Sequence, residues 1–242
     1  MRIAIFSDIH GNLEALSAVL KYLEEEGITN YICGGDVVGY GANPNECVDM
    51  VAALDCPVVM GNHDHAALGL TDITYFNPTA RAALLWTRET LKPERKKFIN
   101  QLEFIYQANN MFLVHAAPRH PDQWEYILSL EAAETNFGFF KEQVCFIGHS
   151  HQPFFVGISS DGNVELITEN PLYIQKDCRY IINVGSVGQP RDGNPNSAIS
   201  IFDTSTQTVS LIRIAYDIEK AQEKIIKSGL PHSLAQRLQN GW

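Results

Sequence analysis

The first half of the chain alternates short apolar runs with segments whose apolar residues recur at helical spacing. The first run, 3–6, predicts a buried strand, and the apolar face that continues to Leu23 predicts a helix that stops at Gly27. Other apolar runs predict strands at 28–33, 57–60, 104–107, 111–114 and 144–147, the third and fourth of them joined as a hairpin. Helices are expected to open at Asn43-Pro44, Asn77-Pro78 and Pro93, and 122–140 is expected to be mostly helical.

The pattern changes after residue 150 from strand–helix alternation to hairpins. Strands at 153–159 and 163–168 flank Asp161-Gly162, a strong hairpin signal. Further strands are expected at 179–184, 197–203 and 208–214, and a last helix at 218–228. These elements predict an α/β domain of two sheets covered by helices. No boundary divides the chain, so we expect a single domain over 1–242, in which 152–242 completes the fold with hairpins and a helix.

Composition narrows the class of protein. Apolar residues make up 45% and charged residues 19% of the 242 positions, which favours a packed core over disorder. The net charge of -10, without a basic run, disfavours long nucleic acids and anionic membranes as partners, although bound metal ions can reverse the local field for an anionic substrate. Five cysteines without a C-x-x-C pair favour a cytoplasmic protein, and the first apolar run is too short for a signal peptide or a membrane span.

Polar residues with metal-binding side chains follow five of the expected strands. The motifs are Asp8-Ile9-His10, Gly34-Gly35-Asp36, Gly61-Asn62-His63-Asp64, His115 and Gly148-His149-Ser150-His151. Ligands of open α/β sheets bind beyond the carboxyl ends of strands, so the five motifs can converge on one site. Each motif alone is more often structural, but the ordered set favours a metal site. Mixed oxygen and imidazole ligands suit manganese, iron, zinc or cobalt, and the absence of cysteine ligands argues against a closed structural zinc site.

The five motifs read D-x-H, G-D, G-N-H-D, a lone histidine and G-H-x-H, and in this order the chain resembles the calcineurin-like metallophosphoesterases between Asp8 and His151. The stretch from Asn183 to Arg191 is similar to the small bacterial and archaeal branch, which includes phosphodiesterase-like and diadenosine-tetraphosphatase-like enzymes. The resemblance implies a four-layer α-β-β-α sandwich of two mixed sheets flanked by helices. This fold agrees with the elements expected from the pattern.

The resemblance also implies two metal ions per chain, which would be manganese, iron, zinc, nickel or cobalt. The matching motifs place Asp8, His10, Asp36 and His151 on the first ion and Asp36, Asn62, His115 and His149 on the second, with Asp36 bridging. A hydroxide that bridges two such ions attacks phosphorus in line. By the same resemblance, His63 is the general acid or a phosphate contact, Asn62 also contacts the substrate, and Asp64 orients His63 through a hydrogen bond.

One departure from the family affects the substrate. The protein Ser/Thr phosphatases of this superfamily carry Asp-Arg-Gly after the second motif and another arginine before G-N-H, whereas this chain has Gly39-Tyr40-Gly41 and Met60. Arg191 is a candidate replacement as a substrate contact, with a surface arginine as the alternative. Gly185 and Ser186 either offer donors to phosphate or shape a turn, and Trp124 and Tyr126 are either core residues or a rim that stacks on a base.

The resulting interpretation is a hydrolase of phosphate esters, with small phosphodiester or nucleotide substrates ahead of monoesters. A phosphomonoesterase or protein phosphatase is the first alternative. A metal-binding scaffold without activity is the second, and it is disfavoured because no motif residue is lost. A hydrolase with a single metal ion is the third, and the position of Asp36 between two ligand groups argues against it.

Overall fold

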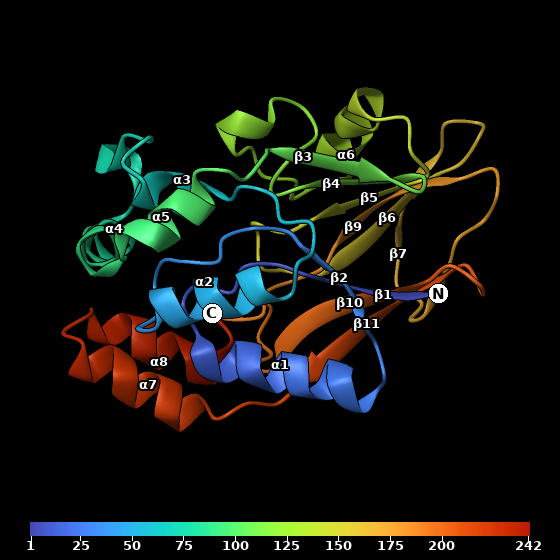
Figure 1. The fold of residues 1–242 in the computed structure, drawn as a ribbon. Helices are drawn as coiled ribbons and strands as arrows, with labels where there is room; N and C mark the ends of the chain where they lie inside the picture. Colours follow the sequence, from blue (N-terminus) through green and yellow to red (C-terminus); the bar gives the residue numbers. More distant parts are fainter.

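Two β-sheets lie face to face in the middle of the molecule (Figure 1), in a computed structural model that describes residues 1–242. The five-stranded sheet has the order β2-β1-β10-β11-β8, and the six-stranded sheet has the order β3-β4-β5-β9-β6-β7. The strands of the first sheet are β1 (Arg2–Phe6), β2 (Asn30–Cys33), β8 (Leu172–Tyr173), β10 (Ser197–Asp203) and β11 (Thr208–Ile214). Those of the second sheet are β3 (Ile105–Ala108), β4 (Met111–Val114), β5 (Val144–Ile147), β6 (Phe154–Ile158), β7 (Val164–Ile167) and β9 (Arg179–Asn183).

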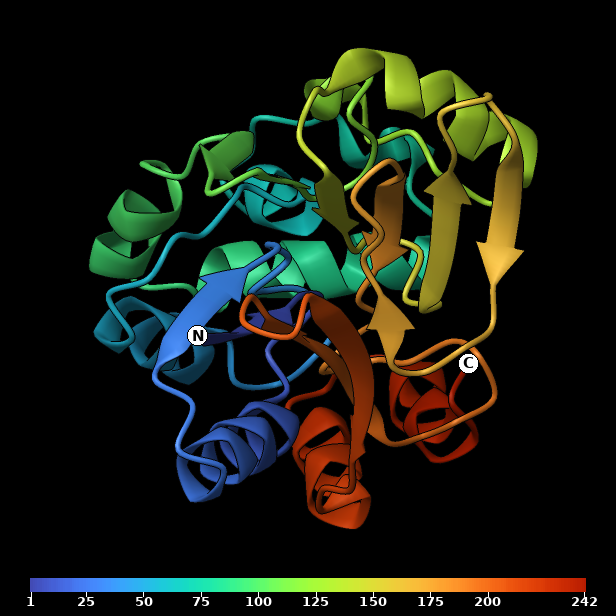
Figure 2. The same cartoon turned by 90° about the vertical axis from the view of Figure 1, so that its right-hand side faces the viewer.

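Helices cover the outer face of each sheet, so the molecule has four layers (Figure 2). The helices are α1 (Leu13–Glu25), α2 (Pro44–Ala53), α3 (Asn62–Ala67), α4 (Pro78–Thr90), α5 (Pro93–Ile99), α6 (Leu130–Asn136), α7 (Ile218–Lys227) and α8 (His232–Asn240), with short 3-10 turns at Ile73–Tyr75, Pro121–Gln123 and Phe137–Phe139. The α-β-β-α sandwich expected from the sequence is therefore confirmed. None of these helices is both long and apolar enough to cross a membrane.

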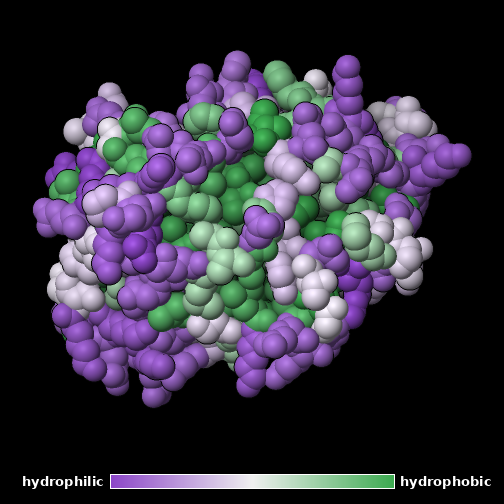
Figure 3. All heavy atoms as spheres, viewed as in Figure 1, coloured by the Kyte–Doolittle hydropathy of each residue, from purple (hydrophilic) through white to green (hydrophobic).

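Alternating side chains of the strands build three apolar layers. In β1, Ile3 and Ile5 face the other sheet and pack with Phe146 and Ile182, whereas Ala4 and Phe6 face α1 and α2. Residues of β4 and β5 that point away from the first sheet pack under α6. Viewed as in Figure 1, hydrophobic residues appear in the middle of the surface and hydrophilic residues make up most of its periphery (Figure 3). Burial on both faces explains why these strands read as short continuous apolar runs.

Parallel pairing places the carboxyl ends of several strands at one edge. In the first sheet β1 runs parallel to β2, and in the second sheet β4, β5 and β9 run parallel to one another. The chain segments that leave these strands therefore emerge on the same side of the molecule. This common edge is where the five polar motifs meet.

Most local signals in the sequence act as expected. The side chains of Asn12 and Asn77 cap α1 and α4 by accepting hydrogen bonds from Ala15 N and Ala80 N. The expected hairpin between β3 and β4 forms, and its turn residues Asn109 and Asn110 adopt positive φ angles. Asparagine tolerates this left-handed conformation better than most residues.

Two segments differ from the expectation. Residues 57–60 form only isolated bridges, Val58 with Cys33 and Val59 with Glu103, because two different neighbours each pair with a single residue of the run. Within 122–140 only Leu130–Asn136 is α-helical, and Trp124 adopts a left-handed conformation that helices exclude.

Three of the helices and strands in the structure are not predicted from the sequence. They are α3, which begins at Asn62, the two-residue strand β8, and α8. Pro231 directly precedes α8, a position that proline tolerates because no intrahelical donor is needed there.

Candidate metal centre

The seven residues expected as ligands are brought together at the common edge of the two sheets, although they come from segments up to 143 positions apart. They are Asp8, His10, Asp36, Asn62, His115, His149 and His151, and none exposes more than 7% of its surface. Six of them, all but Asn62, form three groups together with His63: Asp8–His10–His151, His10–Asp36–His63 and Asp36–His115–His149. Within each group the ligand atoms lie within 4.8 Å of one another. His10 and Asp36 each belong to two of the groups, so the three groups form one continuous cluster.

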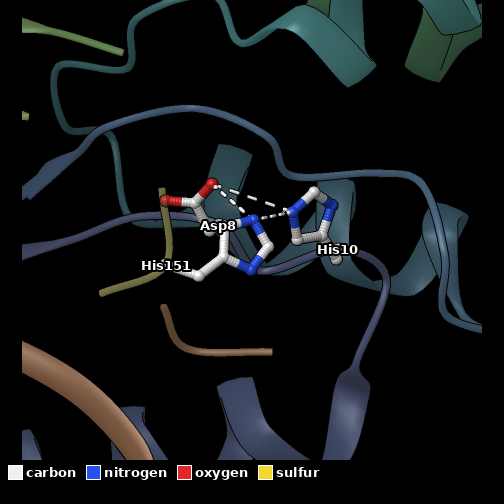
Figure 4. Close-up of side chains that lie close together, drawn as sticks. All are labelled: Asp8, His10 and His151. Atoms are coloured by element: carbon white, nitrogen blue, oxygen red, sulfur yellow. Dashed lines mark hydrogen bonds and ion pairs between the residues drawn. The ribbon is translucent and has the colours of Figure 1, made fainter. Parts of the chain in front are cut away.

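Each of the two carboxylates, Asp8 and Asp36, accepts a backbone hydrogen bond with one oxygen and has no hydrogen-bond partner for the other. Asp8 Oδ2 accepts a hydrogen bond from His149 N at 3.0 Å, and Asp36 Oδ1 accepts one from His63 N at 2.8 Å. The second oxygens, Asp8 Oδ1 and Asp36 Oδ2, are buried and have no hydrogen-bond partner. They point into the cluster, where Asp8 Oδ1 lies 3.2 Å from His151 Nε2 (Figure 4) and Asp36 Oδ2 lies 3.3 Å from His115 Nε2. Buried carboxylate oxygens without a donor fit a cation as the missing partner.

Three of the imidazoles are oriented in the same way. The Nδ1 atoms of His10, His115 and His151 lie 3.2, 2.7 and 2.6 Å from the backbone oxygens of Val38, Gly34 and Gln189. Since a carbonyl only accepts, each Nδ1 carries a proton and each Nε2 faces the cluster, where its lone pair can serve a metal ion. His10 Nε2 and His151 Nε2 lie 3.0 Å apart (Figure 4). Two lone pairs at this distance repel each other unless a proton or a metal ion lies between them.

The electrostatics keep most of the cluster in the protonation states that metal ligands need. Burial lowers the pKa of His10, and it lowers the pKa of His149 to about 3. Burial alone would raise the pKa of Asp36, but the neighbouring His115 and His63 hold it well below its ordinary value. His115 behaves in the opposite way: burial disfavours its charged form, yet Asp36 and Asp8 raise its pKa to about 9. In the protein without metal, a proton on His115 thus compensates part of the charge of the two carboxylates.

The backbone at the cluster is strained. Asp8, His10, Asp36, His149 and His151 all have φ angles between 51° and 65°, a region that residues other than glycine rarely adopt. Such conformations persist only where the surroundings enforce them, and they gather at functional sites. The sequence contains no signal for these angles.

The loop from Asn183 to Arg191 holds the first carboxylate and His151 in place. Ser186 Oγ donates a hydrogen bond to the backbone oxygen of Asp8 at 2.8 Å, and the backbone oxygen of Gln189 accepts from His151 Nδ1. The side chain of Ser186 therefore helps to hold the backbone of Asp8. Gln189 is a residue of the site that sequence reasoning missed, because it acts through its backbone.

His63 joins the cluster through the group with His10 and Asp36, and it lies at the start of α3. Its ring is 4.8 Å from the ring of His10 and 4.4 Å from the ring of Tyr40. Burial lowers the pKa of His63 to about 4. Gly39, at φ 96°, packs directly against this imidazole, and a Cβ atom added there would lie 2.5 Å from His63 Nδ1.

The hydrogen bond expected from His63 to Asp64 is not formed. Asp64 instead accepts from Val38 N at 3.1 Å and Gly61 N at 3.2 Å, and His63 Nδ1 has no hydrogen-bond partner. The carboxylate of Asp64 is occupied because α3 begins here and its first turn leaves backbone amides without helical acceptors. Asp64 thus ties α3 to the loop that carries Gly39.

Arg191 and the aromatic residues occupy the border of the cluster. The guanidinium carbon of Arg191 lies 5.7 Å from the centre of the Tyr40 ring, which itself lies 4.7 Å from the His10 ring. Tyr126 is half-exposed and stacks on His149 with ring centres 4.0 Å apart. Of the two roles left open for the aromatic pair, Tyr126 lies at the rim, whereas Trp124 packs against the apolar core.

Comparisons with known proteins agree with this geometry. The sequence model of the calcineurin-like phosphoesterase superfamily domain matches residues 1–207. An uncharacterized protein of Methanocaldococcus jannaschii is 44% identical over 241 residues, which cover 98% of this chain and 96% of the relative. The crystal structure of a metallophosphoesterase from Sphaerobacter thermophilus has 39% identity and a TM-score of 0.87, and the match covers 100% of this chain and 99% of that one. A hypothetical protein of Pyrococcus horikoshii shares the fold, with a TM-score of 0.80 at 20% identity and coverage of 100% and 98%.

Proposed function

Because the chain belongs to the calcineurin-like phosphoesterase superfamily, we propose that it is a hydrolase of small phosphate esters that works with two metal ions. The observation that carries this proposal is the pair of buried carboxylate oxygens, Asp8 Oδ1 and Asp36 Oδ2, which face imidazole nitrogens and lack any hydrogen-bond donor. Buried His/Asp clusters of this kind are consistent with the dinuclear site typical of the family.

We assign the ligands of the two ions from the three groups of side chains. Asp8, His10 and His151 would hold the first ion, and His115, His149 and Asn62 the second. Asp36 lies between these groups, with Oδ2 at 3.6 Å from His10 Nε2 and at 3.3 Å from His115 Nε2, which supports a bridging role. Imidazole, carboxylate and amide ligands suit manganese, iron, zinc, nickel or cobalt.

When bound, two such ions supply a water that is acidic enough to act as a nucleophile near neutral pH, together with positive charge for the phosphoryl oxygens. The chain's own residues then have two further tasks. His63 would donate the proton that the leaving oxygen needs, or would hold the phosphoryl group by a hydrogen bond, since its ring borders the cluster. Arg191 would bind an anionic oxygen of the substrate from the side of Tyr40.

Two features support phosphodiester or nucleotide-type substrates over long nucleic acids and phosphoproteins. The net charge is -10 and the sequence has no basic run, which disfavours binding along a nucleic acid backbone. The position that carries an arginine in the related protein phosphatases is occupied by Tyr40, whose ring packs on His63 and His10. A small substrate that needs few phosphate contacts fits this site better.

Hydrolysis assays with defined metals test the proposal. The protein would be stripped with a chelator, reloaded separately with manganese, nickel, zinc, cobalt and magnesium, and assayed on bis-p-nitrophenyl phosphate and p-nitrophenyl phosphate. We expect turnover of the diester that requires about two metal ions per chain, as in two-metal sites generally. Turnover of the monoester alone would make the protein a phosphatase. Metal binding without turnover of either ester or of natural nucleotides would favour the scaffold.

A further inference from the structure

Two arginines from distant parts of the chain meet at one tyrosine beside the candidate metal centre. The guanidinium carbon of Arg191 lies 5.7 Å from the centre of the Tyr40 ring, and that of Arg237, in α8, lies 6.0 Å from it. The same ring lies 4.4 Å from the ring of His63. The two cations therefore border the place where a substrate would contact His63.

Neither arginine is paired with an acidic side chain. Of the nine arginines, those at positions 2, 95, 119 and 213 form salt bridges with Asp or Glu, and Arg191 and Arg237 are among the five that form none within 4.0 Å. Arg191 donates only to the neutral amide oxygen of Gln189, through Nε at 3.3 Å and Nη2 at 2.8 Å. Arg237 donates through Nε to an oxygen of Trp242, the last residue of the sequence, at 2.6 Å. Neither terminal nitrogen of Arg237 forms a hydrogen bond, so both can donate to an anion.

The fold holds the two cations near each other at an electrostatic cost. Tyr40 is only 7% exposed, because it packs in an apolar cluster with Ala80 of α4 and with Leu234 and Leu238 of α8. Burial lowers the pKa of the Arg237 guanidinium, and the like charge of Arg191 lowers it further. Two half-buried guanidinium groups with no acidic side chain beside them are stabilised further by a bound anion.

Because the metal centre would take the phosphoryl group that is hydrolysed, the arginine pair is available for another group of the same substrate. Guanidinium groups match phosphate oxygens through two parallel hydrogen bonds, which a tyrosine face can support from behind. We propose that Arg191 and Arg237 together bind a second phosphoryl group of the substrate. The inference rests on the proposed function and narrows its substrate class to molecules with at least two phosphoryl groups.

The proposed second phosphoryl site depends on the C-terminal helices, because Arg237 lies in α8. The family model matches residues 1–207, whereas α7 and α8 lie beyond it, at 218–227 and 232–240. The two helices place Arg237 over Tyr40 through the apolar contacts of Leu234 and Leu238. The second phosphoryl site thus combines Tyr40 and Arg191, which lie within the matched part, with Arg237 from the helices beyond it.

Binding of two phosphonates to the metal-loaded protein tests the inference without turnover. Methylenediphosphonate carries two phosphoryl groups and methylphosphonate carries one. Calorimetry should give tighter binding of the diphosphonate to the wild type, and Arg237→Gln should reduce the affinity for the diphosphonate by about tenfold to a hundredfold, the usual value of a charged hydrogen bond. The affinity for the monophosphonate should change much less. Arg191→Gln should act in the same direction, and metal content should be measured after each titration.

Two further variants keep the result interpretable. Arg237→Lys retains the charge without the planar fork and should recover part of the lost affinity. Arg81→Gln removes an exposed arginine of α4 that forms no salt bridge, and it should leave both affinities unchanged. Equal loss of both phosphonates, or no loss of the diphosphonate in folded Arg191 and Arg237 variants, would overturn the second phosphoryl site. A wild type that binds phosphonates but hydrolyses no phosphoester would overturn the proposed function instead.

Discussion

Replacing Asp36 by asparagine removes one negative charge from the centre of the cluster with almost no change in shape. Asp36 Oδ1 accepts a hydrogen bond from His63 N at 2.8 Å, and the asparagine oxygen would keep that position for the same reason. Its amide nitrogen must then take the place of Oδ2, which lies 3.3 Å from His115 Nε2. In the variant, an amide group with two N–H donors therefore replaces Asp36 Oδ2, an oxygen that could bind a cation.

The magnitude follows from the distance between the two charges. Both side chains are no more than 1% exposed, so solvent screens them little. At an effective dielectric constant of about 20, a unit charge at 3.3 Å from the imidazolium is worth about 5 kcal/mol. This loss is large enough to bring the pKa of His115 from about 9 to below its ordinary value in the metal-free protein. Replacing a residue that hydrogen-bonds to a metal ligand typically weakens metal binding by roughly 10–100-fold. Removing Asp36, a ligand shared by both ions, should weaken metal binding by more than this.

Two measurements check these expectations independently. The imidazole resonances of His115 in the chelator-treated protein report its pKa, and metal analysis after dialysis reports how many ions are retained. Asp49→Asn is a matched control, since Asp49 pairs with Arg95 on the surface. An unchanged pKa of His115 would refute the electrostatic argument. Retention of two metal ions with wild-type affinity would refute the bridging role of Asp36.

Four further expectations concern the same site. His63→Ala should keep the metal content and lower kcat by about 10²–10⁴, the usual range for a proton donor, and wild-type kcat would remove His63 from the mechanism. Gly39→Ala should lower kcat, because the new Cβ atom would displace the His63 ring. Gly69→Ala is the control: its φ of 82° is similar, but the new Cβ atom would meet no other atom within 4 Å, so this variant should only lose stability. Equal kcat in both variants would contradict this explanation. Removal of the metal ions should lower the thermal stability, because an ion at 100 times its Kd stabilises the folded state by about 2.7 kcal/mol, and a chelator without effect on Tm would argue against occupied sites. In the metal-free folded protein the pKa of His149 is lowered to about 3, whereas in the unfolded chain it is about 6.5. As the pH drops from about 6.5 toward 3, the unfolded chain therefore binds a proton on His149 that the folded protein does not, and the free energy of unfolding should fall. His149→Gln should flatten this part of the plot of stability against pH.

Much of the fold and of the candidate site could be read from local patterns. Strand–helix alternation and the hairpin signal at Asp161-Gly162 predicted the elements, because burial on two faces and turn chemistry act over a few residues. The five motifs predicted which residues meet, since parallel strands β1, β2, β4 and β5 end at one edge. The segments that were read incorrectly, 57–60 and 122–140, are those in which pairing or backbone conformation depends on distant neighbours.

What the chain determines by itself is thus the list of metal-binding side chains and the order of the elements that carry them. Only the tertiary structure decides how those side chains are used. It shows that Asp64 holds α3 instead of His63, that backbone oxygens of Val38, Gly34 and Gln189 orient three imidazoles, and that Arg237 reaches Tyr40 from the far end of the chain. The physical reason is that a side chain's type is local information, whereas its hydrogen-bond partner, its burial and the charges around it depend on which distant segments pack against it.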